Sequence, residues 1–211
     1  MATRRKYLRI GFVGLLIFVV VAVLIGRRAG SEKDGSDSFV AVTASPVPAG
    51  TVATPSDATP TRIVISRIGV DAPITTKGIG ANGEMESPDG PEDVAWYGFT
   101  ARPGGGSNAV FSAHVDYHGY GPAVFADLKK LEKGDLVEVH TADGTMYRYE
   151  VTLSLSYPGE TAPTEEIVGP TSREVITLIT CAGTFDQAAR QYSHRLVVRA
   201  ERVAGGEAVG P

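Results

Sequence analysis

Short runs rich in β-branched residues, separated by turn residues, fill the chain from Arg62 to Arg202 and restrict it to a fold built mainly of strands. The expected strands cover residues 62–68, 70–74, 94–97, 108–113, 136–140, 146–155, 175–180 and 196–202. Helices do not alternate with these runs, which excludes a doubly wound parallel sheet. We therefore predict one antiparallel β-barrel or β-sandwich over residues 61–211, a length that suits a single hydrophobic core.

Turn and helix signals agree with this fold class. Ala142-Asp143-Gly144 lies between two of the runs and predicts a β-hairpin, and Asn82-Gly83 predicts a further turn. Only residues 124–132 carry apolar side chains at helical spacing, which predicts a short helix that ends before Gly134. The segment from Ser156 to Ser172 is expected to be a long loop, and such loops often carry function.

An apolar run without charge extends over 17 residues from Ile10 to Gly26. This length is at the short end of the roughly 17–25 residues that a membrane-spanning helix needs. Four basic residues precede the run and two follow it, which predicts that residues 1–9 are cytoplasmic and that the rest of the chain is extracellular. A cleaved signal peptide is the alternative, but its apolar region is usually about 7–15 residues long and ends at small residues rather than at arginines. We predict an uncleaved single-pass anchor at the cell membrane.

Residues 27–60 have the composition of a linker between this anchor and the β-rich region. Of residues 29–60, 22 are Ala, Ser, Thr, Pro or Gly. Such a segment cannot bury enough apolar surface to offset the entropy lost on ordering. We predict a flexible tether, and a short docked strand at Phe39–Val42 is the alternative.

Cys181 is the single cysteine of the chain, so it has no partner for an intrachain disulfide. It follows the apolar run Val175–Thr180 and precedes Ala182-Gly183-Thr184, which we interpret as a strand end that opens into a loop of small residues. A buried, inert thiol is the alternative, because free cysteines are among the most buried residues.

His114 ends another apolar run, and Arg195 begins the last one. Together these residue types supply the thiolate, proton donor and oxyanion-stabilising group that cysteine catalysis needs.

The other histidines and the overall charge exclude two classes of function. His118 follows His114 in a glycine-rich segment, His140 lies at the shoulder of the hairpin, and His194 neighbours Arg195. No pair of these residues has the spacing of a zinc site, so we predict no metal and no cofactor. The first 28 residues carry a charge of +6 and the remainder −10, which is not the basic surface of a nucleic-acid-binding protein.

Several of these segments resemble the sortase family. Residues 177–181, TLITC, are similar to the TLxTC signature, and residues 111–116, FSAHVD, resemble the strand end that carries the family's histidine. Arg195, at the start of the last strand, is similar in position to the family's arginine. The resemblance covers residues 61–203, and residues 180–200 look most like the class F group of actinobacterial sortases, with class E as the alternative. Ala113 departs from the pattern, since many relatives have glycine before the histidine.

This resemblance implies a closed eight-stranded β-barrel with one or two short helices, following an N-terminal transmembrane helix. It also implies a cysteine transpeptidase of Gram-positive bacteria that cuts a C-terminal LPXTG-like sorting signal through a thioacyl intermediate. The acyl group would pass to an amine of a peptidoglycan precursor or of a pilin lysine. By motif, Cys181 is the nucleophile, His114 the general acid and then the base, and Arg195 the oxyanion stabiliser. Thr180, beside the nucleophile, is expected to order the substrate or the oxyanion site.

Alternatives remain for individual residues and for the function. Arg195 could be a surface charge, with Arg190 and Arg199 as rivals for its role. Asp116 could orient a histidine or cap a turn. The competing function is a non-enzymatic, membrane-tethered binding module of the cell envelope, in which Cys181 would have only a structural role.

Overall fold

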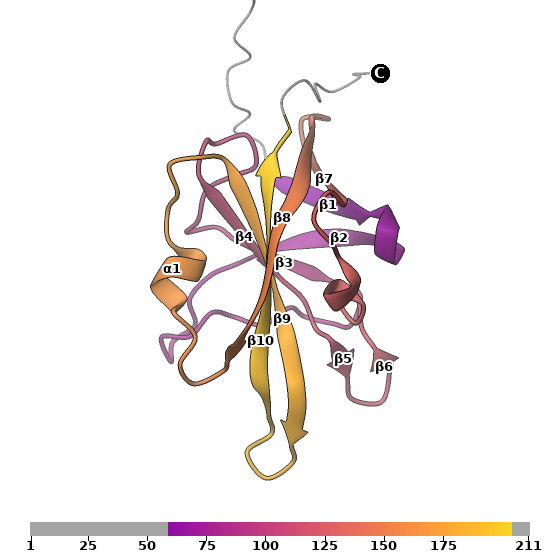
Figure 1. Cartoon of the computed structure of the whole chain (residues 1–211), viewed down its shortest axis with the longest axis vertical. Coiled ribbons are helices and arrows are strands. Elements are labelled where there is room, and N and C mark those ends of the chain that lie inside the picture. The colour runs from indigo at the N-terminus through magenta and orange to yellow at the C-terminus, as the bar shows by residue number, and fades with distance from the viewer. Residues whose placement is uncertain (1–58, 204–211) are drawn as a thin grey trace, which may run out of the picture. The chain divides into compact units, whose positions relative to one another are not determined.

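Each of the eight expected runs forms a strand of one closed barrel in the computed structural model, which describes residues 59–203 (Figure 1). Around the barrel the strands follow the order β1–β2–β3–β4–β9–β10–β8–β7. The barrel strands are β1 (Pro60–Ile65), β2 (Val70–Lys77), β3 (Val94–Tyr97), β4 (Asn108–Ser112), β7 (Leu136–Thr141), β8 (Met146–Pro158), β9 (Val175–Asp186) and β10 (Gln191–Arg202). The other elements are β5 (Asp116–Tyr117), β6 (Gly121–Pro122), the 3-10 helices η1 (Ser66–Ile68) and η2 (Leu128–Lys130), and the helix α1 (Thr164–Val168). The predicted mainly β, closed eight-stranded barrel with few helices is therefore confirmed.

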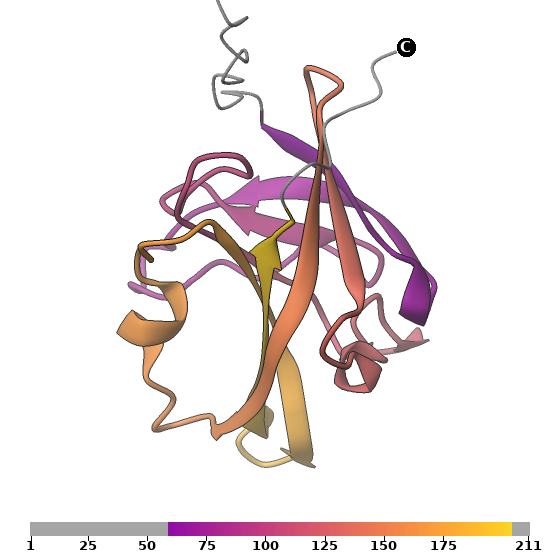
Figure 2. The same cartoon turned by 45° about the horizontal axis from the view of Figure 1, so that its top comes forward.

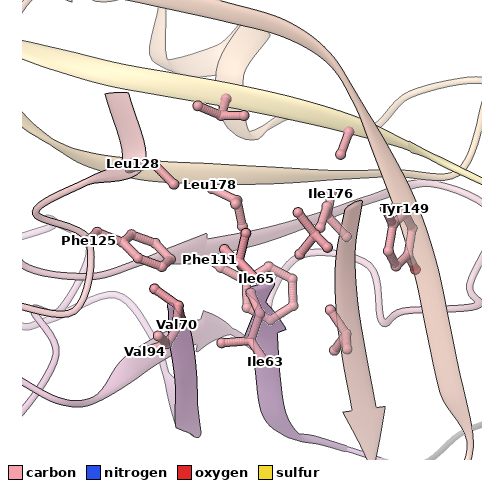
Figure 3. Close-up of a cluster of buried hydrophobic side chains, with 14 of the residues drawn as sticks. Ile63, Ile65, Val70, Val94, Phe111, Phe125, Leu128, Tyr149, Ile176 and Leu178 are labelled. Carbon is pink, nitrogen blue, oxygen red and sulfur yellow. The ribbon is translucent and has the colours of Figure 1, made fainter. Parts of the chain in front are cut away.

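The barrel interior is filled by every second residue of its strands. Ile63 and Ile65 of β1 are fully buried, as are Ile176 and Leu178 of β9. Figure 3 shows these side chains converging with Phe111 in the centre of the barrel. Successive side chains of a strand point to opposite faces, so the residues between them form the outer face. Burial of such side chains stabilises the fold by roughly 1.5–3 kcal/mol each.

Two of the neighbouring strand pairs are parallel, which corrects the expectation of an antiparallel barrel. These pairs are β2–β3 and β4–β9, and the others around the barrel are antiparallel. Parallel neighbours require a crossover of about a dozen residues or more, and residues 78–93 and 113–174 provide these crossovers. The second crossover is important for function, because it brings the end of β4 next to the middle of β9.

The helix expected over residues 124–132 is reduced to the single 3-10 turn η2, so that prediction is wrong. The backbone N–H groups of Leu128, Lys130 and Leu131 donate to carbonyls three residues earlier, which is the 3-10 pattern rather than the four-residue pattern of an α-helix. The apolar residues Phe125, Leu128 and Leu131 are all buried at a spacing of three. That spacing matches the three residues per turn of a 3-10 helix.

The ends of three strands also differ from expectation. β9 and β10 continue as a long hairpin, side by side in Figure 1, with its turn at residues 187–190. Cys181 therefore lies within β9 rather than at its end. The expected loop from Ser156 to Ser172 is shortened, because β8 extends to Pro158 and α1 occupies Thr164–Val168.

The expected anchor at residues 10–26 and almost all of the expected linker lie outside the described residues. Between residues 59 and 203, no helix is long and apolar enough to cross a membrane.

Candidate active site

Cys181 and Arg195 are direct cross-strand partners in the β9–β10 hairpin. Partners in an antiparallel pair point to the same face of the sheet. Their inward-facing neighbours, Thr180 and Leu196, are buried, whereas Cys181 and Arg195 are partly exposed on the outer face. The thiol and the guanidinium group thus lie on one face of adjacent strands.

His114 is placed beside the same part of β9 by the parallel pairing of β4 with β9. The last aligned pair is Ser112 with Ile179, and His114 and Cys181 each follow two residues later. Two hydrogen bonds continue the alignment beyond β4: the Ala113 N–H donates to the Ile179 carbonyl at 3.2 Å, and the Thr180 hydroxyl donates to the Ala113 carbonyl at 2.8 Å. The buried Thr180 side chain thus connects the strand of the thiol to the residue before His114.

The His114 ring is held from two sides. Its Nε2 atom lies 3.3 Å from the carbonyl oxygen of Pro88. Its ring also packs edge-on against Tyr117, with a centroid separation of 5.2 Å. Of the residues predicted for the site, His114 thus follows the end of β4, Cys181 lies in the neighbouring β9, and Arg195 lies in β10.

Arg195 has one engaged nitrogen. Its Nη1 atom donates to the carbonyl oxygens of Tyr192 and His194, both at 3.1 Å. Among residues 59–203, no acceptor is hydrogen-bonded to its Nε or Nη2 atoms. The backbone therefore fixes the guanidinium while N–H donors stay available for a substrate.

The two rival arginines have different surroundings. Arg199 shares the outer face with Arg195, but its Nη2 atom donates to the carbonyls of Glu166 and Ile167 in α1, and its Nε atom donates to Thr177. Arg190 is exposed in the hairpin turn with a positive φ of 54°. Arg199 thus fastens α1 to the barrel, and Arg190 shapes the turn.

A β-bulge follows Cys181 where a loop of small residues was expected. The register shifts between the pairs Ala182–His194 and Phe185–Tyr192. Gly183 lies in the bulge with φ of +81°, and a Cβ there would clash with the Ser193 hydroxyl. Bulges of this kind re-aim side chains and often lie next to active sites. A glycine is therefore required two residues after the thiol.

The electrostatic environment of Cys181 has opposing contributions. Burial raises the pKa of the thiol above its ordinary value, the positive charge of Arg195 lowers it, and the negative charge of Asp116 raises it. Burial is the largest of these, so the net pKa is raised. Arg195 thus favours the thiolate, which is the reactive form.

Asp116 and Tyr192 form an interaction that the sequence analysis did not predict. The Tyr192 hydroxyl donates to the Asp116 carboxylate at 2.5 Å, which joins β10 to β5. This bond raises the pKa of Tyr192 to about 12. Asp116 was expected to orient a histidine or to cap a turn, and it is instead bound by this phenol. Tyr192 precedes Arg195 by three residues, but no motif in the sequence marked it.

A cavity of about 130 Å³ lies beside the thiol. Its lining residues are Val115, Phe125, Ala126, Lys129, Thr180, Cys181, Ala182, Gly183, Tyr192 and Leu196. Thr180, Ala182 and Leu196 belong to the inward-facing set of their strands. The cavity therefore borders Cys181 itself as well as inward-facing residues of β9 and β10.

The remaining histidines stand apart from this group. His118 is exposed in the loop between β5 and β6, and His140 lies in β7. The Nδ1 atom of His194 is 2.8 Å from the Ser193 hydroxyl. Within residues 59–203, no three His, Cys, Asp or Glu side chains gather in a group that could hold a metal ion.

Comparison with known proteins agrees with this geometry. Residues 63–203 match the family described as a sortase domain. The chain belongs to the sortase family. Membership of the sortase family indicates a cysteine transpeptidase. No curated protein matches the chain.

Solved structures of sortases from several classes are similar to this barrel. Sortase C-1 from Actinomyces oris is 29% identical, with 68% of this chain and 73% of that chain covered and a TM-score of 0.54. A lid mutant of sortase A from Corynebacterium diphtheriae is 25% identical, with 69% and 70% covered and a TM-score of 0.53. Sortase C2 of Group B Streptococcus Pilus Island 1 is 27% identical, with 68% and 73% covered and a TM-score of 0.52.

Proposed function

We propose that this sortase is a membrane-anchored, extracellular cysteine transpeptidase of the class F group that cleaves a C-terminal LPXTG-like sorting signal and transfers the acyl group to an amine. The observation that carries the proposal is the pairing of Cys181 with Arg195 on one outer face, beside the strand end of His114. The anchor rests on residues 10–26 and their basic flanks, and the class on residues 180–200.

The three side chains have complementary roles in the proposed reaction. The Cys181 thiolate attacks the carbonyl carbon of the scissile peptide bond, and the free N–H donors of Arg195 stabilise the resulting oxyanion. His114 gives its proton to the leaving amine, which leaves a thioester on Cys181. An acceptor amine then attacks the thioester carbonyl, His114 takes the surplus proton, and the C–S electron pair returns to Cys181 as thiolate. Thr180 maintains the alignment of the two strands through its bond to Ala113.

The outer face of the barrel offers an apolar surface for the sorting signal. Val197 and Leu155 are cross-strand partners on the same face as Arg195, and Leu155 is 41% exposed. On β9, the partly buried Ile179 continues this surface toward Val168 of α1. We propose that the leucine and proline of the signal lie against this surface, because burial of their apolar side chains is favourable. In this position of the signal, the Thr–Gly bond lies at Cys181.

Mass spectrometry of peptide cleavage tests the proposed function. The full chain is incubated with a library of LPXTG-like peptides, with and without an alkylamine acceptor. We expect cleavage between Thr and Gly, and in the presence of the amine a product whose mass corresponds to its addition. Peptides with the same residues in scrambled order serve as the control. Absence of cleavage for every library member would favour a binding module.

Arg195→Ala is expected to lower kcat by about 10²–10³-fold, the typical loss on removal of one oxyanion donor. Arg195→Lys should recover little of this, since a lysine is a flexible point charge without the fork of arginine donors. Arg199→Ala is the matched control, because Arg199 lies on the same face but is committed to α1. Steady-state kinetics with a cleaved peptide measure the three variants. A larger loss of kcat in Arg199→Ala than in Arg195→Ala would assign the oxyanion role to Arg199.

A further inference from the structure

We propose that the cavity beside Cys181 is the acceptor subsite, and that Asp116, held by Tyr192 at its edge, recognises the acceptor as a primary ammonium group. This inference rests on the proposed transpeptidase function and adds the binding site of the second substrate. Tyr192 lines the cavity, and Asp116 follows Val115, which also lines it. The 2.5 Å hydrogen bond between Tyr192 and Asp116 fixes the carboxylate at this edge.

Asp116 is an acidic group without a cationic partner beside a nucleophile. Among residues 59–203, no lysine, arginine or histidine forms an ion pair with it. Its charge raises the pKa of the Cys181 thiol and thus opposes formation of the thiolate. A carboxylate in this place is unfavourable for the first step of catalysis, but it attracts a cation to the thioester in the second step.

The cavity and the proposed sorting-signal surface involve different residues around Cys181. The sorting signal is expected to contact the outward-facing residues of β9 and β10, whereas Thr180, Ala182 and Leu196 of the cavity face inward. A thioester on Cys181 could therefore be approached by the acceptor while the acyl chain still occupies the outer face. A cavity of about 130 Å³ has room for an aminomethyl or aminoethyl group, but not for a second peptide.

Charged groups around the cavity direct the approach of the amine. Lys129 lines the cavity with an exposed side chain, and Arg195 lies on the outer face opposite Cys181. Both are positive and repel an ammonium group, whereas Asp116 attracts it. An amine is therefore expected to enter along the side formed by Asp116 and Tyr192.

Recognition as ammonium is compatible with the chemistry of aminolysis. The ammonium releases one proton to solvent water, and the neutral amine attacks the thioester carbonyl carbon. As the C–N bond forms and the C–S bond breaks, the second proton passes from nitrogen to His114 and the electron pair remains on the Cys181 sulfur. Asp116 neither gains nor loses a proton in this sequence and acts only in binding.

Competition between two nucleophiles tests the subsite. The full chain cleaves a sorting-signal peptide in the presence of both an Nα-acetyl-lysine amide, whose side chain is an ammonium at pH 7, and hydroxylamine, which is mostly uncharged at that pH. Asp116→Asn keeps an oxygen that can accept the Tyr192 hydrogen bond but removes the charge. We expect the ratio of lysine product to hydroxylamine product to fall about threefold to fivefold, as for loss of an exposed ion pair. Because both products arise from the same thioester, the ratio does not depend on the reactivity of the thiol.

Glu92→Gln is the matched control for Asp116→Asn. Glu92 accepts a hydrogen bond from Tyr120 at 2.7 Å, so it forms a similar carboxylate–phenol pair, but it does not line the cavity of Cys181. Its substitution should leave the product ratio at the wild-type value. An unchanged ratio in Asp116→Asn, with both products formed by the wild type, overturns the subsite and leaves the transpeptidase intact. Absence of both products from the wild-type reaction overturns the proposed function together with the subsite.

Discussion

Cys181→Ala is expected to abolish cleavage of sorting-signal peptides while the barrel stays folded. The reaction requires a covalent thioester, and Cys181 is the single cysteine in the chain. The substituted side chain is partly exposed on the outer face of β9, so its loss leaves no closed core cavity. The thermal unfolding temperature should change far less than for a core truncation, which costs about 2–5 kcal/mol. Peptide turnover measured by mass spectrometry and unfolding followed by circular dichroism give the two results.

The reactivity of the thiol provides an independent measurement on the same residue. Since burial and Asp116 raise the pKa of Cys181, the rate of alkylation should reach its half-maximum above the pH of an isolated cysteine, about 8.5. Arg195→Gln removes a charge that lowers this pKa, so the midpoint should move further upward. Asp116→Asn removes a charge that raises it, and the midpoint should move downward. Near-wild-type cleavage by Cys181→Ala would exclude the thioester mechanism.

The sequence was sufficient to predict the barrel because its strands have strong alternation. Ile63 and Ile65 alternate with exposed or partly exposed residues, and a strand with one buried face requires this pattern. The helical pattern over residues 124–132 was misleading, because Phe125 and Leu128 belong to a 3-10 turn, in which hydrogen bonds join residues three apart rather than four. The parallel pairing of β4 with β9 was not predictable, since it depends on a crossover rather than on local residue preferences.

The predicted site residues were found by motif, but their arrangement was not contained in the motif. That Cys181 opposes Arg195 depends on the register of a hairpin longer than the apolar runs alone indicate. Gly183 was interpreted as part of a loop, whereas its positive φ belongs to a bulge within the hairpin. Tyr192 was missed, because its importance comes from a contact with Asp116, which is 76 residues away in sequence.

His114→Ala is expected to lower kcat by about 10²–10⁴-fold, the usual contribution of a general acid or base. The alignment of β4 with β9 carries the His114 backbone to the level of Cys181, and Pro88 and Tyr117 hold its ring. His118→Ala is the matched control, since His118 is only four residues away but exposed in the β5–β6 loop. It should stay within about twofold of the wild type, as is usual for a surface substitution of less than about 0.5 kcal/mol. Steady-state kinetics under saturating peptide compare the two variants.

The choice of leaving group separates acid catalysis from a role of His114 in folding or binding. An amine must be protonated as it leaves, whereas the alcohol of an activated ester departs as a stable anion. If His114 donates the proton, His114→Ala should lose much less activity on an activated ester of the sorting signal than on the peptide. A merely structural role would reduce the two rates equally, since both substrates require the same site. An equal loss on ester and peptide, or a loss in His118→Ala as large as in His114→Ala, would remove the general acid assignment from His114.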